Sequence, residues 1–169
     1  MKLSSFQAIV RVLNDANVPF IIVGGLAVNA HGYGRYTGDV ELVIKLDPQA
    51  IRGAFEALAS LGYRPRVPVT AEGFSDPDQR ASWIADKGMT ILGFLSDTHR
   101  ETPIGMLVAD PFDFDEEHRE ALVEEAAPGA SVRILRLVAL LKLKQEAGRP
   151  QDLADIAVLK QMHEAAVDA

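Results

Sequence analysis

The chain has 169 residues, 48% of them hydrophobic and 24% charged, the balance of an ordinary globular protein with one hydrophobic core. It has no cysteine, which excludes a disulfide framework, a thiolate metal site and a cysteine nucleophile. The net charge of −7 argues against broad, nonspecific DNA binding, which depends on a cationic surface. No apolar run reaches the roughly 18 residues of a membrane span, and no signal peptide is recognisable, so we expect no membrane association and a cytoplasmic protein.

The periodicity of apolar residues predicts short strands interleaved with helices. In chain order these are a helix over 3–16, a strand over 20–23, a helix over 26–31, a glycine-rich loop over 32–38, a strand over 40–45, a helix over 49–61, strands over 89–95 and 104–108, a helix over 114–125, a short strand over 131–134, and helices over 135–147 and 152–165. Residues 63–86 hold three prolines and lack periodicity, so we interpret them as a loop with at most a short helix near 78–84.

This order predicts an α/β (α+β) fold, in which a small mixed β-sheet is flanked by helices and followed by a C-terminal helical pair. We expect residues 1–169 to form a single domain. Its sheet-bearing core would cover 1–110, and 111–169 would be mainly helical.

The stretch from Phe20 to Asp47 carries the strongest indication of chemistry. Gly24 and Gly25 directly follow a buried strand, where the absence of Cβ atoms permits a tight turn and lets a phosphate approach the amides of the next helix. Asp39 and Glu41 are two residues apart on a predicted strand, so both side chains would project from one face. Two adjacent carboxylates repel unless a cation bridges them, and hard oxygen ligands suit Mg²⁺.

Each of these features has a simpler interpretation when it is taken alone. A Gly-Gly pair is usually only a turn, and an acidic pair on a strand is usually a solvated face. Their combination, in this spacing and order, favours a metal and nucleotide site.

The glycine pair, a short helix and then Asp39-Val40-Glu41 resemble the signature of the DNA-polymerase-β-like nucleotidyltransferase superfamily, a Gly-Gly or Gly-Ser followed by Asp-x-Asp/Glu. The stretches VGGLAVNAHG and TGDVELVI are similar to the minimal nucleotidyltransferases. The C-terminal LLKLKQEAGRPQDLADIAVL resembles the branch that contains AbiEii-type toxins. There a K-x4-R-x2-D-x2-D arrangement flanks the nucleotide site, and its positions here are Lys144, Arg149, Asp152 and Asp155.

The resemblance implies transfer of a nucleoside monophosphate from a nucleoside triphosphate to an acceptor hydroxyl, with Mg²⁺ or Mn²⁺ as the cofactor. It assigns metal binding and catalysis to Asp39 and Glu41. Nucleotide binding falls to the glycine turn and the C-terminal motif, which are Gly24, Gly25, Lys144, Arg149 and Asp152. The acceptor would be an RNA, a protein or a small molecule, and an antitoxin protein would be the partner.

The sequence departs from the superfamily pattern on the neighbouring strand. The superfamily places a third carboxylate there, and in ETPIGMLVADPF that position falls on Gly105, which has no side chain to bind metal or accept a proton. Asp97 and Asp110 are candidate substitutes, although Asp110 lies an odd number of residues from Gly105 and would face the other way. Two hypotheses follow: an active transferase, or a degenerate module that binds a nucleotide or a protein partner without turnover.

Overall fold

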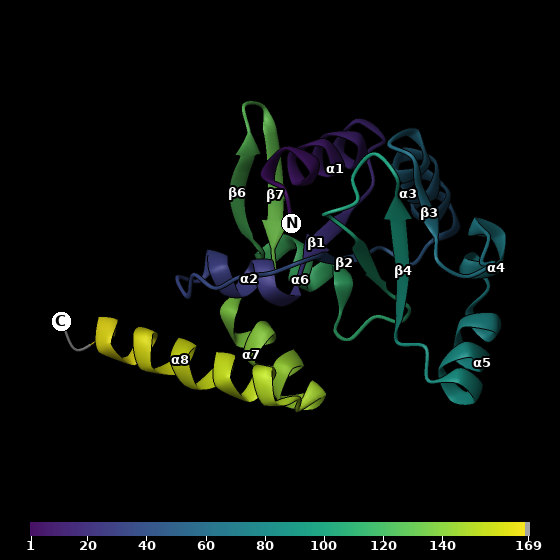
Figure 1. Ribbon diagram of the computed structural model, residues 1–169. Helices are drawn as coiled ribbons and strands as arrows, with labels where there is room; N and C mark the ends of the chain where they lie inside the picture. Colours follow the sequence, from purple (N-terminus) through teal and green to yellow (C-terminus); the bar gives the residue numbers. More distant parts are fainter. Residues whose placement is uncertain (168–169) are drawn as a thin grey trace.

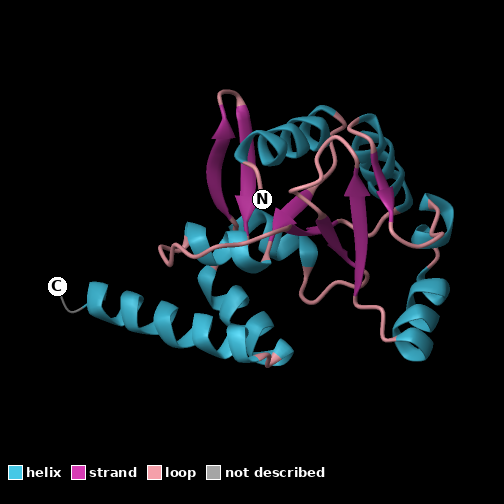
Figure 2. Ribbon diagram, viewed as in Figure 1, coloured by secondary structure: helices cyan, strands magenta, loops and turns pink. Residues whose placement is uncertain are grey.

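The computed structural model describes residues 1–167, with side chains through residue 164. Within this part of the chain, seven strands form one sheet and eight helices surround it (Figures 1 and 2). The strands are β1 (Phe20–Ile22), β2 (Val40–Ile44), β3 (Tyr63–Pro65), β4 (Ile91–Ser96), β5 (Ile104–Leu107), β6 (Leu122–Ala127) and β7 (Ala130–Ile134). The helices are α1 (Leu3–Asp15), α2 (Gly24–Ala30), α3 (Pro48–Ser60), α4 (Ala71–Ser75), α5 (Pro77–Lys87), α6 (Phe114–Glu120), α7 (Leu137–Ala147) and α8 (Pro150–Val167).

The sheet is mixed, with the strand order β3-β4-β5-β2-β1-β7-β6. Strand β2 is therefore the central strand. It runs antiparallel to β1, with Ile22 opposite Leu42, and parallel to β5, with Glu41 opposite Gly105. The predicted fold class, a mixed sheet flanked by helices with a C-terminal helical pair, is confirmed.

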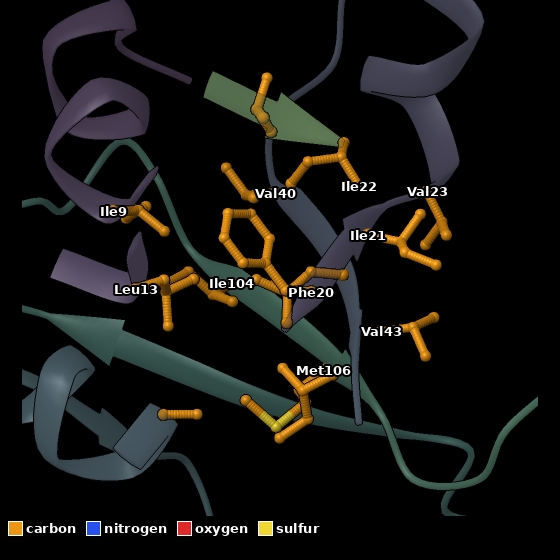
Figure 3. Close-up of a cluster of buried hydrophobic side chains, with 14 of the residues drawn as sticks. Ile9, Leu13, Phe20, Ile21, Ile22, Val23, Val40, Val43, Ile104 and Met106 are labelled. Atoms are coloured by element: carbon orange, nitrogen blue, oxygen red, sulfur yellow. The ribbon is translucent and has the colours of Figure 1, made fainter. Parts of the chain in front are cut away.

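The hydrophobic core lies between the sheet and helices α1 and α3, which pack against each other. Val40, Leu42 and Ile44 of β2 are completely buried. Figure 3 shows Ile9 and Leu13 of α1 close to Phe20 and Ile104 in this cluster. Because side chains alternate along a strand, burial of Val40 and Leu42 against this layer directs Glu41 to the opposite face of the sheet.

That opposite face carries α2, which contacts both β2 and α7, while α7 packs against α8 (Figure 1). Residues 111–169 thus contribute the helical pair and also β6 and β7, which extend the same sheet. Among the described residues, no helix is both long and apolar enough to cross a membrane.

The helix predicted over 114–125 is wrong in its second half. Helix α6 begins after the N-cap Asp113, whose side chain accepts a hydrogen bond from the amide of Glu116, and it ends at Glu120. The following residues form β6, which pairs antiparallel with β7 around a turn at Gly129 (φ 72°). A carboxylate oxygen of Glu125 accepts a hydrogen bond from the Gly129 amide at 2.8 Å. Glu124 and Glu125 lie exposed on this edge strand, where pairing with β7 determines the conformation.

The loop predicted over 63–86 is wrong in part: it contains β3 and α4, and the short helix expected near 78–84 is the longer α5. Two N-caps begin the helices. Thr70 accepts a hydrogen bond from the amide of Gly73, and Asp76 accepts hydrogen bonds from the first amides of α5, whose first residue is Pro77. These are ordinary helix-start signals. Only Pro77 begins a helix, whereas Pro65 is the last residue of β3 and Pro68 lies in the bend before α4.

Candidate functional site

The glycine pair begins helix α2 and lies directly against the acidic strand. Gly24 has φ +62°, a left-handed backbone conformation that favours glycine, and a Cβ atom there would overlap the Oε2 atom of Glu41. A Cβ atom on Gly25 would lie 2.5 Å from Oγ1 of Thr37. Neither position has room for a side chain, because Glu41 and Thr37 occupy that space.

The two carboxylates of the predicted pair line one cavity. Glu41 is the second residue of β2, and Asp39 immediately precedes that strand and is exposed. Both line a cavity of about 250 Å³ together with Gly25, Thr37 and Arg149, which we call the polar cavity. Burial raises the pKa of Glu41, and the negative charge of Asp39 raises it further, while Arg149 and Lys144 act in the opposite direction. A cation bound between the carboxylates would relieve this repulsion.

The C-terminal motif forms a buried network of ion pairs between α7 and α8. The Lys144 ammonium, with a side chain only 5% exposed, donates to Asp152 at 2.9 Å and lies 2.7 Å from Asp155. Arg35 of the glycine-rich loop donates two hydrogen bonds to the carboxylate of Asp155, at 2.7 and 2.8 Å. The network therefore ties both C-terminal helices to the loop that precedes Asp39.

Arg149 is the exposed member of this network. Its Nε donates to Asp152 at 2.6 Å, yet its side chain remains 65% exposed. Its charge acts on Glu41, and those of Glu41 and Asp39 act on it in turn. A cation in this position can meet a phosphate next to the carboxylate pair. Lys144 and Asp152 also line the polar cavity, but their charges already satisfy each other.

Gly105 is the register partner of Glu41 on β5, so the two positions are neighbours on the same face of the sheet. A Cβ atom on Gly105 would lie 3.7 Å from Cγ of Glu41 and 3.0 Å from Cγ2 of Ile91. A carboxylate at this position would stand beside Glu41, but glycine supplies none.

The two candidate substitutes lie elsewhere. Asp97 is 71% exposed and pairs with Arg64 at 3.1 Å. Asp110 lies near Arg80, and burial raises the pKa of its carboxyl group. Neither residue lines the cavities that contain Glu41.

A second cavity, of about 420 Å³, adjoins the polar cavity at Glu41. We call it the apolar cavity, because most of its wall is aliphatic: Ile91, Leu107, Leu140, Leu143 and Ala147. It shares Glu41, Lys144, Arg149 and Asp152 with the polar cavity, whereas Gly24 lines only the apolar side and Gly25 only the polar side. The two cavities are therefore neighbours that meet at Glu41 and the C-terminal ion network.

The donor set fits a cation that arrives with phosphates. No cluster of three or more potential metal-ligating His, Cys, Asp or Glu side chains occurs among the residues that the structure describes. Asp39 and Glu41 alone provide two carboxylates, and Mg²⁺ in nucleotide sites is commonly held by one or two carboxylates plus substrate phosphates. These residues thus match a metal–nucleotide unit better than a metal bound by protein ligands alone.

Arg35 is the one member of the ion network that the sequence analysis did not predict. The sequence pointed to it only through its place, as a single arginine in the glycine-rich loop shortly before Asp39. Trp83 packs against Phe74 with ring centroids 6.5 Å apart and lines neither cavity around Glu41.

No family model matches the sequence, and neither does any curated protein. Solved structures do resemble the fold. A crystal structure of ANT(2'')-Ia in complex with adenylyl-2''-tobramycin has a TM-score of 0.60 and 14% identity, covering 97% of this chain and 90% of that chain. A solution structure of the antibiotic-resistance factor ANT(2'')-Ia has a TM-score of 0.55 and 15% identity, covering 98% and 92%. The chain therefore shares the nucleotidyltransferase fold of these proteins.

Proposed function

We propose that the protein binds a nucleoside triphosphate with Mg²⁺ or Mn²⁺ and transfers the nucleoside monophosphate to an acceptor hydroxyl, releasing pyrophosphate. The observation that supports this most strongly is the contact of the Gly24 turn with Glu41, with Asp39 in the same cavity. The fold adds support, since a protein with the same architecture is known in complex with an adenylylated product.

The residues of the site divide between metal binding, phosphate binding and positioning. Asp39 and Glu41 would hold the metal, which when bound supplies Lewis-acid stabilisation of the charge on the phosphates. The amides at Gly24 and Gly25 and the Arg149 guanidinium would bind phosphate oxygens. Lys144 and Asp152 would act by orienting Arg149, because their own charges are buried and paired.

Transfer can be tested directly. The protein is incubated with each of the four labelled nucleoside triphosphates, Mg²⁺ or Mn²⁺, and fractions of cellular RNA, protein and small molecules as acceptors. Label should appear in one fraction, and Asp39→Asn should lower its rate by at least about a hundredfold, as expected when a group that stabilises transition-state charge is removed. Label transfer that is equal in the wild type and Asp39→Asn would refute the proposed site.

Gly105 favours a second candidate, a degenerate member of the fold that binds a nucleotide or a protein partner with little or no turnover. The register partner of Glu41 carries no carboxylate, and neither Asp97 nor Asp110 lines the cavities around Glu41. Binding of a nucleotide without label transfer to any fraction would favour this candidate.

The C-terminal motif extends the proposal to a toxin that is held in check by an antitoxin protein in the cytoplasm. This extension rests on the sequence resemblance of Lys144, Arg149, Asp152 and Asp155. Induced expression should then arrest growth, and Asp39→Asn should relieve the arrest. Arrest that persists in Asp39→Asn would separate toxicity from the acidic pair.

A further inference from the structure

The two cavities that meet at Glu41 differ in chemistry. The polar cavity is bounded by Thr37, Asp39, Arg149 and Gln151, whereas the apolar cavity is enclosed by β4 and β5 on one side and α7 on the other. A cavity of about 420 Å³ with aliphatic walls and a few polar groups at one end has the size and character of a small-molecule site.

Phosphoryl transfer requires separate spaces for the nucleotide phosphates and for the acceptor. In an in-line displacement the attacking oxygen and the leaving group lie on opposite sides of the phosphorus atom. If the phosphates occupy the polar cavity beside Asp39 and Gly25, the acceptor hydroxyl needs a separate space that opens toward the same phosphorus atom. The apolar cavity adjoins the polar cavity at Glu41 and provides such a space.

We infer that the apolar cavity binds the acceptor, and that this acceptor is a small molecule with a hydroxyl group on an apolar body. This inference rests on the proposed function and adds the class of substrate to it. The hydroxyl would lie at the Glu41 end, and the body would contact Leu107, Leu140 and Leu143.

The same walls disfavour a polycationic sugar such as the tobramycin of the structural neighbour. Ammonium groups lose their hydration when they are placed against aliphatic side chains, which is costly without a partner. Of the acidic residues that line the cavity, Asp152 is already paired with Lys144 and Arg149. Glu41 and the exposed Glu146 border the cavity as well, whereas the aliphatic part of its wall, Ile91, Leu107, Leu140, Leu143 and Ala147, carries no charge.

The test uses the full chain and two probes, naphthol as a hydroxyl on an apolar body and tobramycin as a polycation. Binding is measured by ligand-observed NMR, with and without Mg²⁺ and the non-transferable analogue α,β-methylene ATP. Naphthol should bind with a Kd of about 1 mM or below, the range expected for a fragment of its size. It should still bind when the analogue is present, and more tightly than tobramycin.

Matched variants locate the binding. Ala147 is an exposed residue at the end of α7 and lines the apolar cavity, whereas exposed Gln145 on the same helix lines neither cavity. Ala147→Trp should weaken naphthol binding at least about tenfold and leave the thermal shift caused by the analogue unchanged, while Gln145→Trp should change neither.

Three results would overturn the inference: displacement of naphthol by the analogue, equal naphthol binding by the wild type and Ala147→Trp, or tighter binding of tobramycin. Failure of the proposed function gives a different result. The analogue with Mg²⁺, and equally the α,β-methylene analogues of GTP, CTP and UTP, would then produce no thermal shift in the wild type, and the assignment of this cavity to an acceptor would fall with it.

Discussion

At the scale of single residues, Gly24 determines how the site is built. Its φ of +62° and its contact with Glu41 both require the absence of a side chain. The backbone angle and the contact with Glu41 would each cost free energy if residue 24 had a side chain, since a left-handed backbone is unfavourable for other residues even in open space. Substitutions can measure the two costs separately.

Gly24→Ala should lower the free energy of unfolding by about 1–3 kcal/mol, because the alanine backbone must adopt a left-handed conformation and its methyl group must displace the Glu41 carboxylate. In a Glu41→Ala background the overlap with the carboxylate disappears and only the Cβ of residue 41 remains close, at 3.0 Å, so the same substitution should cost less, about 1 kcal/mol. Urea unfolding measures both. Gly34→Ala is the control, since a Cβ there meets no heavy atom within 4 Å. An equal cost for Gly24→Ala in both backgrounds would show that Glu41 does not occupy this space.

Under the degenerate alternative, the missing carboxylate at Gly105 limits turnover. Gly105→Asp would place a carboxylate beside Glu41, and it should raise the rate of nucleotidyl transfer by about 10²–10⁴-fold, the usual contribution of a general base. The added Cβ lies 3.0 Å from Cγ2 of Ile91, so Gly105→Asp with Ile91→Ala provides a second variant with more room. Transfer is measured with labelled nucleotides.

Gly93→Asp is the matched control. Gly93 of β4 pairs with Gly105, so an aspartate at position 93 carries the same charge one strand farther from Glu41. It should leave transfer slow. Rapid transfer by the wild type would contradict the degenerate alternative and would require another acid to complete the site.

At the scale of elements, the ion network of Lys144, Asp152, Asp155 and Arg35 connects α7, α8 and the glycine-rich loop. Burial acts to raise the pKa of Asp155, but hydrogen bonds from Arg35, Lys144 and Gln151 outweigh it and lower the pKa to about 2. Because this carboxylate is ionised more readily in the folded than in the unfolded chain, it stabilises the fold above about pH 4. That contribution is lost as the pH falls toward about 2.

Asp155→Asn should therefore lower the free energy of unfolding at about pH 7 by about 2–4 kcal/mol, since Arg35 and Lys144 lose a buried counter-ion. Between about pH 4 and pH 2 the stability of the variant should fall less steeply than that of the wild type, because the titrating group is gone. Urea unfolding at several pH values measures both effects, with Asp15→Asn as an exposed control. Parallel pH profiles for the wild type and Asp155→Asn would contradict the network.

Among the elements, those that local sequence patterns specify could be predicted. The strand with Asp39 and Glu41 at its start, the glycine turn and the C-terminal helices all follow from periodicity and helix breakers. Strand β6 could not be predicted, because Glu124 and Glu125 are poor strand residues and only pairing with β7 makes them extended. Helices α4 and α5 were predictable in principle, since Thr70, Asp76 and Pro77 are helix-start signals.

At the scale of the whole molecule, the fold brings together residues from both ends of the chain. Gly24, Glu41 and Arg149 are distant in sequence but line adjoining cavities, because β1 and β2 pair at the sheet centre and α7 packs against α2. The sequence could identify these residues one motif at a time. It could not show that Lys144 is neutralised by two aspartates, that Arg35 joins them, or that a second, aliphatic cavity opens beside Glu41. Those features depend on long-range packing.

Both the active and the degenerate alternatives require Asp39 and Glu41 to bind a metal with a nucleotide, so that binding is the central claim. Thermal unfolding with Mg²⁺ or Mn²⁺ and ATP, GTP, CTP or UTP tests it directly. For at least one nucleotide the Tm of the wild type should rise by about 5–10 °C at a ligand concentration near 100 times Kd. Asp39→Asn should lose most of this rise, and Asp97→Asn, which removes an acid outside both cavities, should retain it. Equal shifts in the wild type and Asp39→Asn would contradict the account.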